Sequence, residues 1–123
     1  MCNVQELRLQ YNNIGNAGLT AFAEAVESGA LPQLEDLRLH YNQIGDVGMQ
    51  ALAGAVSKGA LASLKTLSLY GNQIGDTGLS ALAKAITPGP SGKGALPQLE
   101  TLYIFQDAPA LKAACGARGI TFY

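Results

Sequence analysis

The sequence predicts an α/β protein, a right-handed solenoid with a parallel sheet on its concave side and helices on its convex side. The stretch LRLQYNNIG at residues 7–15 returns as LRLHYNQIG at 37–45 and as LSLYGNQIG at 67–75. In each copy, leucines at alternate positions indicate a strand, and the residues that follow have helical apolar spacing. Repetition on this scale is typical of solenoids, in which each unit buries its apolar face against its neighbours.

The repeats make one domain, residues 1–123, of four units, which we place at residues 1–30, 31–60, 61–95 and 96–123. Leu7, Leu37 and Leu67 are 30 residues apart, whereas the step from Leu67 to Leu102 is 35 residues. The five additional residues lie in TPGPSGKGA, at the end of the third unit. Its proline and glycine content predicts a solvated return loop.

Each unit is expected to begin with a short strand and an asparagine turn. In the second unit, Leu37 and Leu39 share one face of the strand, so the polar residues that alternate with them share the other. Asn42 follows, and its side chain can bond backbone groups that the turn leaves unpaired. We therefore expect Asn12, Asn42 and Asn72 to form a ladder along the stack.

The remainder of each unit is predicted to be helical. The segment GDVGMQALAGAVSKG carries apolar residues at i, i+3, i+4 and i+7, counted from Met49. This spacing places them on one face of a helix. Asp46 is expected to cap the start of this helix or to contribute favourable charge there, and Gly59 is expected to end it.

The fourth unit departs from this pattern. The segment LETLYIFQDAPALKAACGARGITFY keeps the strand, but Asp107 takes the asparagine place and the helix is shorter. Alternation in ITFY predicts a fifth strand that closes the stack. We therefore interpret the fourth unit as a C-terminal cap, for which the first unit has no equivalent.

The signature LxLxxNxIGDxGxxALAxAI is intact in the third unit and, apart from Val56 in place of the last Ile, in the second, and it is present in the first as LRLQYNNIGNAGLTAFAEAV. It resembles the leucine-rich repeats of the ribonuclease-inhibitor type, and the resemblance covers essentially the whole chain. It implies a short horseshoe arc that binds proteins in the cytoplasm. It names no partner, because such proteins share the scaffold while their exposed residues differ.

Composition argues against several other classes of function. The chain contains eight Lys and Arg and nine Asp and Glu. Its nearly neutral charge creates no electrostatic field that would attract nucleic acid or an anionic membrane, and we expect neither as a partner. The single histidine, His40, has no second histidine or reactive serine motif to work with, so we predict no enzyme activity, no cofactor and no metal. Cys2 and Cys115 lack the spacing of a metal site or a disulfide framework.

A binding function is expected at the outward-facing strand positions, where the repeats differ from one another. Most of the aromatic residues lie there, although folding does not require them on that face. Tyrosine and arginine are the typical anchors of protein interfaces. We predict a protein- or peptide-binding site on the concave face, formed by Arg8, Tyr11, Arg38, His40, Tyr41, Tyr70, Tyr103 and Phe105.

The start of the first unit supports further hypotheses. The backbone around Glu6, Arg8 and Gln10 is expected to form a sheet edge, which could pair antiparallel with a second copy in a homodimer. A chain that pairs in this way would be a self-associating structural module. In the competing hypothesis, the chain is a fragment or engineered section of a longer repeat array. The resemblance to leucine-rich repeats also implies a minor alternative, the regulation of a GTPase.

Overall fold

The structure is a computed structural model that describes residues 4–88 and 94–123. Helices and strands alternate along these residues, and β5 is the fifth strand expected from ITFY. Cys2 and the middle of the TPGPSGKGA loop lie outside the described residues. In chain order the elements are β1 (Glu6–Arg8), α1 (Gly15–Glu27), β2 (Asp36–Arg38), α2 (Asp46–Ser57), β3 (Thr66–Ser68), α3 (Asp76–Ile86), β4 (Thr101–Tyr103), α4 (Pro109–Arg118) and β5 (Thr121–Phe122).

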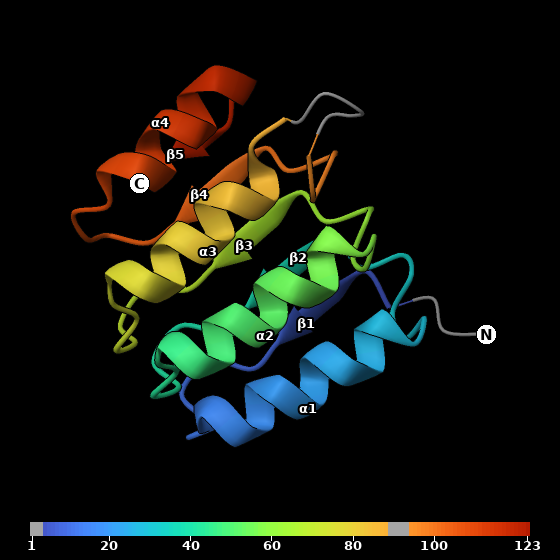
Figure 1. Cartoon of the computed structure of the whole chain (residues 1–123). Helices are drawn as coiled ribbons and strands as arrows, with labels where there is room; N and C mark the ends of the chain where they lie inside the picture. Colours follow the sequence, from blue (N-terminus) through green and yellow to red (C-terminus); the bar gives the residue numbers. More distant parts are fainter. Residues whose placement is uncertain (1–3, 89–93) are drawn as a thin grey trace.

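The strands form one parallel sheet in the order β1-β2-β3-β4-β5. Their register sets the repeats side by side, because Leu7 pairs with Leu37, Leu37 with Leu67, and Leu67 with Leu102. The helices lie next to one another over one face of this sheet (Figure 1). Each helix thus serves as the crossover that parallel strands require. The predicted α/β solenoid is confirmed.

The core lies between the sheet and the helices and is built from the leucines of the repeat signature. In the second unit, the side chains of Leu37, Leu39, Ile44 and Leu52 are no more than 1% exposed. The equivalent residues of the first unit, Leu7, Leu9, Ile14 and Phe22, are only half-buried. The first unit is therefore less completely covered than the second. None of the helices in the described residues has the length and apolarity needed to cross a membrane.

Asparagine side chains join successive turns. Asn42 Oδ1 accepts a hydrogen bond from the backbone N–H of Asn12 at 2.7 Å, and Asn42 Nδ2 donates to the carbonyls of Leu9 at 2.7 Å and Leu39 at 3.1 Å. Asn72 makes the same kinds of bonds one unit further along. Asn12 Nδ2 donates within its own unit, to Leu9 and Gln10. Each interior asparagine therefore bonds its own turn and the preceding one.

The starts of α2 and α3 are capped by side chains of the preceding unit, which corrects the capping role predicted for Asp46, although Asp46 does place its charge in the first turn of α2. Asp46 is the first residue of α2, yet its Oδ1 accepts hydrogen bonds from the backbone N–H groups of Gly75 and Gly78, each at 2.8 Å, at the start of α3. Asn16 does the same for the start of α2. A Cβ atom at Gly78 would lie 2.7 Å from Asp46 Oδ1. The second glycine of the G-D-x-G motif thus makes room for a cap that comes from another unit. Gly59, at φ 100°, lies just beyond the end of α2, as expected.

The fourth unit is attached differently. The connection from β4 to α4 spans residues 104–108, which is shorter than the connection from β3 to α3 at residues 69–75. Asp107, which takes the asparagine place in this unit, is exposed and takes part in none of the hydrogen bonds found among the described side chains. Gln106 Nε2 instead donates to the carbonyl of Ile74 at 2.9 Å. Arg118 secures the other end of the unit by donating to the carbonyls of Ile86, Ala95 and Leu96.

Candidate functional site

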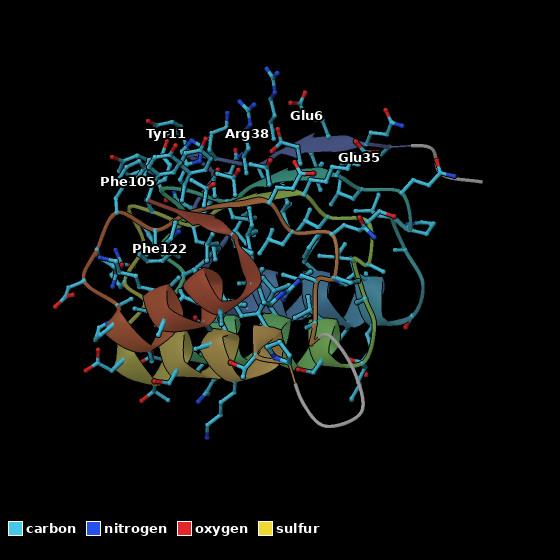
Figure 2. All side chains as sticks on the ribbon, turned by 90° about the horizontal axis from the view of Figure 1, so that it is seen from above. Glu6, Tyr11, Glu35, Arg38, Phe105 and Phe122 are labelled. Atoms are coloured by element: carbon cyan, nitrogen blue, oxygen red, sulfur yellow. The ribbon has the colours of Figure 1, made fainter. Side chains whose placement is uncertain are left out.

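The side of the sheet turned away from the helices, which we call the open sheet face, carries all the residues predicted to bind a partner. Figure 2 shows Glu6, Tyr11, Arg38 and Phe105 projecting from this side, whereas Phe122 lies on the helix side and packs against the core. Ring contacts, ion pairs and a shared hollow bring the predicted residues together, namely Arg8, Tyr11, Arg38, His40, Tyr41, Tyr70, Tyr103 and Phe105.

Seven rings form one continuous cluster where the strands end. Tyr11 stacks on Tyr41, with 4.9 Å between ring centroids and 11° between ring planes. His40 stacks on Tyr70 at 4.4 Å and 7°. Tyr70 in turn meets Phe105 edge to face at 5.0 Å. Such pairs contribute about 0.5–1.5 kcal/mol each beyond the area they bury. The aromatic cluster consists of Tyr11, His40, Tyr41, Tyr70, Tyr103, Phe105 and Tyr123.

A glycine supports one ring of the cluster. Tyr11, Tyr41 and Gly71 hold the same turn position in three units, and all three have left-handed backbone, with φ of 63°, 59° and 72°. Two of them are tyrosines, so this backbone conformation does not by itself require glycine here. A Cβ atom at Gly71 would lie 2.5 Å from ring atoms of Tyr41. The missing side chain therefore allows the Tyr41 ring to lie against the next turn.

The arginines of the open sheet face are already paired within the chain. Arg38 lies 3.2 Å from Asp36 and 3.4 Å from Glu6, and Arg8 lies 3.1 Å from Glu6. The hydrogen bond and the charge of Asp36 raise the pKa of Arg38. Exposed pairs of this kind contribute about 0–1 kcal/mol to stability. The two arginines and the two carboxylates together carry no net charge. This end of the open sheet face is therefore polar, with neither positive nor negative charge in excess.

A hollow of about 510 Å³ lies between the charged end and the aromatic cluster. It exists because β3 contributes the short side chains of Thr66 and Ser68, whereas the register places the longer Arg38 and Tyr103 on either side of Ser68. Two atoms next to it, Asp36 Oδ1 and His40 Nδ1, are buried and have no hydrogen-bond partner among the described residues. Buried polar atoms are rarely left in this state.

His40 differs from its prediction as an exposed contact residue. Its side chain lies on the expected face, but the rings of Tyr11, Tyr41 and Tyr70 surround it and leave the residue 8% exposed. Burial, and then the charge of Arg38, lower the pKa of His40. The neutral form of the imidazole therefore predominates at pH 7, and the ring packs among the surrounding tyrosines.

This lowered pKa makes stability depend on pH. As the pH falls below the ordinary histidine value of about 6.5, the unfolded chain takes up a proton before the folded chain does. The free energy of unfolding should therefore fall between pH 7.5 and pH 5.5, and more steeply for the wild type than for His40→Gln. Urea unfolding at several pH values measures this difference. Equal slopes for the two proteins, or a His40 ring that titrates at its ordinary value by NMR, would contradict it.

Tyr123 is the member of the aromatic cluster that we did not predict. It stacks on Tyr103 with 5.1 Å between centroids and 9° between planes. Its backbone carbonyl accepts hydrogen bonds from Ile104 and Phe105 at 2.9 and 2.8 Å. The signal was present in the alternation of ITFY, which places Tyr123 on the side opposite Ile120 and Phe122.

Cys115 belongs to the core and not to the open sheet face. It lies in α4 and is fully buried. Burial raises the pKa of its thiol to about 11. The reactive thiolate form is therefore scarce at neutral pH.

Comparison with known families agrees with the repeat structure. A family model described as Leucine Rich repeat matches residues 1–23, 31–53 and 60–83, which together make up more than half of the chain. Each match contains one strand and most of the helix that follows it. No curated protein matches the sequence.

Proposed function

Because this chain belongs to the leucine-rich repeat family, whose repeats generally serve as protein-binding scaffolds, we propose that it binds a protein or peptide through the open sheet face. The family is typically non-catalytic, and we propose a recognition role without enzyme activity. The family match includes the strand of each of the first three units, and the open sheet face runs across these strands and continues onto β4 and β5.

The exposed part of the aromatic cluster is the observation that carries this proposal. Tyr11 is 70% exposed, Phe105 62%, Tyr123 51% and Tyr41 46%. These rings lie on the face opposite the core, where leucines already supply the buried apolar surface. Tyrosine and phenylalanine rings concentrate at the centres of protein interfaces because they bury large areas at low entropic cost. An aromatic surface of this kind fits a partner that contributes apolar side chains.

The hollow beside the cluster supports a more specific contact. A partner side chain that enters it meets the hydroxyls of Thr66 and Ser68 on one side and the Tyr103 ring on another. The polar lining that Asp36, Thr66 and Ser68 give the hollow favours a side chain that brings a hydrogen-bond donor. The proposed partner therefore presents an apolar patch for the cluster and a neighbouring polar donor for the hollow.

We also propose that the repeats are of the ribonuclease-inhibitor type and that the protein acts in the cytoplasm. Each unit contains a helix of 10 to 13 residues, which supports a type with a fully helical convex side. The buried, free Cys115 is consistent with a reducing compartment.

Paired variants test the proposed binding face. Peptides selected from a random library on the wild-type chain provide defined ligands, whose affinities are then measured by calorimetry. The double variant Tyr41→Ala, Phe105→Ala should bind at least about 30-fold more weakly, because losing one well-packed aromatic anchor costs about 2 kcal/mol or more.

Val47→Ala is the matched control, since Val47 is 63% exposed but lies on α2, on the other side of the molecule. It should leave the affinity unchanged. Binding that survives the double variant, or that the Val47 change weakens equally, would place the site elsewhere.

A further inference from the structure

The outer edge of β1 has backbone groups that are directed away from the sheet and that no described strand pairs with. Leu9 N–H donates to Arg38 O at 2.9 Å, and Gln5 O accepts from Asp36 N–H at 3.0 Å, so both residues point toward β2. Backbone groups of successive strand residues point to opposite sides. Those of Glu6 and Arg8 therefore point outward, where no strand pairs with β1 in residues 4–88 and 94–123.

The core beneath this edge is also incompletely covered. Leu7, Leu9, Ile14 and Phe22 line it and remain half-buried, although their counterparts in the second unit are closed off by a neighbouring unit on each side. An uncovered edge with apolar flanks favours pairing with another chain. The occupant has to supply both a strand and an apolar surface.

The charges of β1 identify the occupant. We infer that a second copy of this chain pairs with β1, antiparallel and about a two-fold axis that passes beside Leu7. In this register Leu7 faces Leu7, and Glu6 of each copy faces Arg8 of the other. The sequence Glu-Leu-Arg is thus complementary to itself when reversed.

The same register satisfies the backbone. Glu6 and Arg8 are the residues whose N–H and C=O groups point outward, so each Glu6–Arg8 pair exchanges two hydrogen bonds across the axis. Side chains directly opposite each other in an antiparallel pair lie on the same face of the sheet. Each carboxylate therefore comes beside the guanidinium of the other copy.

Another parallel strand with the same charges, added at the outer edge of β1, would not pair opposite charges. In the chain's own parallel register, Glu6 pairs with Asp36 and Arg8 with Arg38, which sets like charges side by side. The antiparallel copy instead sets opposite charges against the outer edge of β1, while Asp36 and Arg38 remain its neighbours on the other side. It also keeps both helix layers on one side of a continuous sheet, so α1 of each copy covers the half-buried residues of the other. The two aromatic clusters then lie at opposite ends of one continuous open sheet face.

A charge exchange tests this inference independently of partner binding. Sedimentation equilibrium of the wild-type chain should show a dimer at micromolar concentration. Glu6→Arg sets arginines opposite each other across the axis, and Arg8→Glu sets glutamates opposite each other, so each single variant should weaken dimerisation at least about tenfold. The double variant Glu6→Arg, Arg8→Glu should restore it, because Arg-Leu-Glu is again self-complementary.

Mixing the Glu6→Arg and Arg8→Glu variants is the decisive experiment. In their heterodimer, arginine faces glutamate at both contacts across the axis. The mixture should associate as tightly as the wild type, while circular dichroism confirms that each variant remains folded. A wild-type chain that stays monomeric at hundreds of micromolar would overturn the inference. A dimer that the single changes do not weaken would also overturn it. The same holds if the variants fold but neither the double variant nor the mixture of single variants restores dimerisation.

Discussion

Replacing Asn42 with alanine is expected to lower the free energy of unfolding by about 3 kcal/mol. The Asn42 side chain is fully buried and bonds backbone groups of two successive turns, including Asn12 N–H and the carbonyls of Leu9 and Leu39. Alanine leaves the backbone N–H groups of Asn12 and Ile14 without the acceptor that Asn42 Oδ1 supplies, in a place where water has little access. It also removes one of the two asparagine donors of the Leu9 carbonyl and of the Leu39 carbonyl. Each buried polar group that loses its partner costs about 1–3 kcal/mol. Urea unfolding followed by circular dichroism measures the change.

Asn12→Ala is the matched control in the same asparagine position. Asn12 is exposed and its side chain donates to the carbonyls of Leu9 and Gln10 in its own unit, so its loss should cost less than about 1 kcal/mol. Asn42→Asp keeps the acceptor but buries a carboxylate whose second oxygen faces the carbonyls of Leu9 and Leu39, so it should cost at least as much as Asn42→Ala. Equal costs for Asn12→Ala and Asn42→Ala would show that bonding between units does not hold the turns together.

Leu52→Ala is expected to cost about 2–5 kcal/mol, which includes the cavity left in a closely packed core. Leu52 lies on the inner side of α2 and is 1% exposed. Its helix packs between α1 and α3, so neighbours on both sides limit how far the cavity can close. Val47→Ala on the same helix should change stability by less than about 0.5 kcal/mol, because Val47 is exposed. A Leu52→Ala protein as stable as the Val47→Ala protein would contradict the assignment of the core face.

The sequence was sufficient to predict the fold because three copies of the repeat carry the same pattern and must adopt the same local structure. Leu7, Leu37 and Leu67 recur at one spacing, and a parallel in-register sheet is the arrangement that brings them together. The alternation around them then determines which side chains reach the open sheet face. The fifth strand followed from the same alternation in ITFY.

Interactions between units were harder to predict, because the rules for capping a helix are local in sequence. Asp46 is at the start of α2, and a local rule assigns it to that helix, whereas its partners Gly75 and Gly78 are about 30 residues away. The repeat period contains this information, since Asn16 has the same relation to the start of α2. Comparing neighbouring units, rather than searching within one, would have revealed it.

The details of the open sheet face depend on side-chain conformations that no pattern in the sequence specifies. Alternation places His40 outward, but its burial results from the way three tyrosine rings close around it. The ion pairs of Arg38 likewise depend on the directions its side chain takes toward Glu6 and Asp36. The hollow arises from differences in side-chain size between adjacent strands, which become visible once the register is known.

Chemical-shift mapping of the isotope-labelled chain with a selected peptide ligand tests the central claim most directly. If the open sheet face is the binding site, the largest amide shifts should fall where the strands end, near His40, Tyr70 and Phe105, and the single His40 ring should shift with them. The helices should be little affected. Shifts confined to α1, α2, α3 and α4, with the strand ends unchanged, would contradict it.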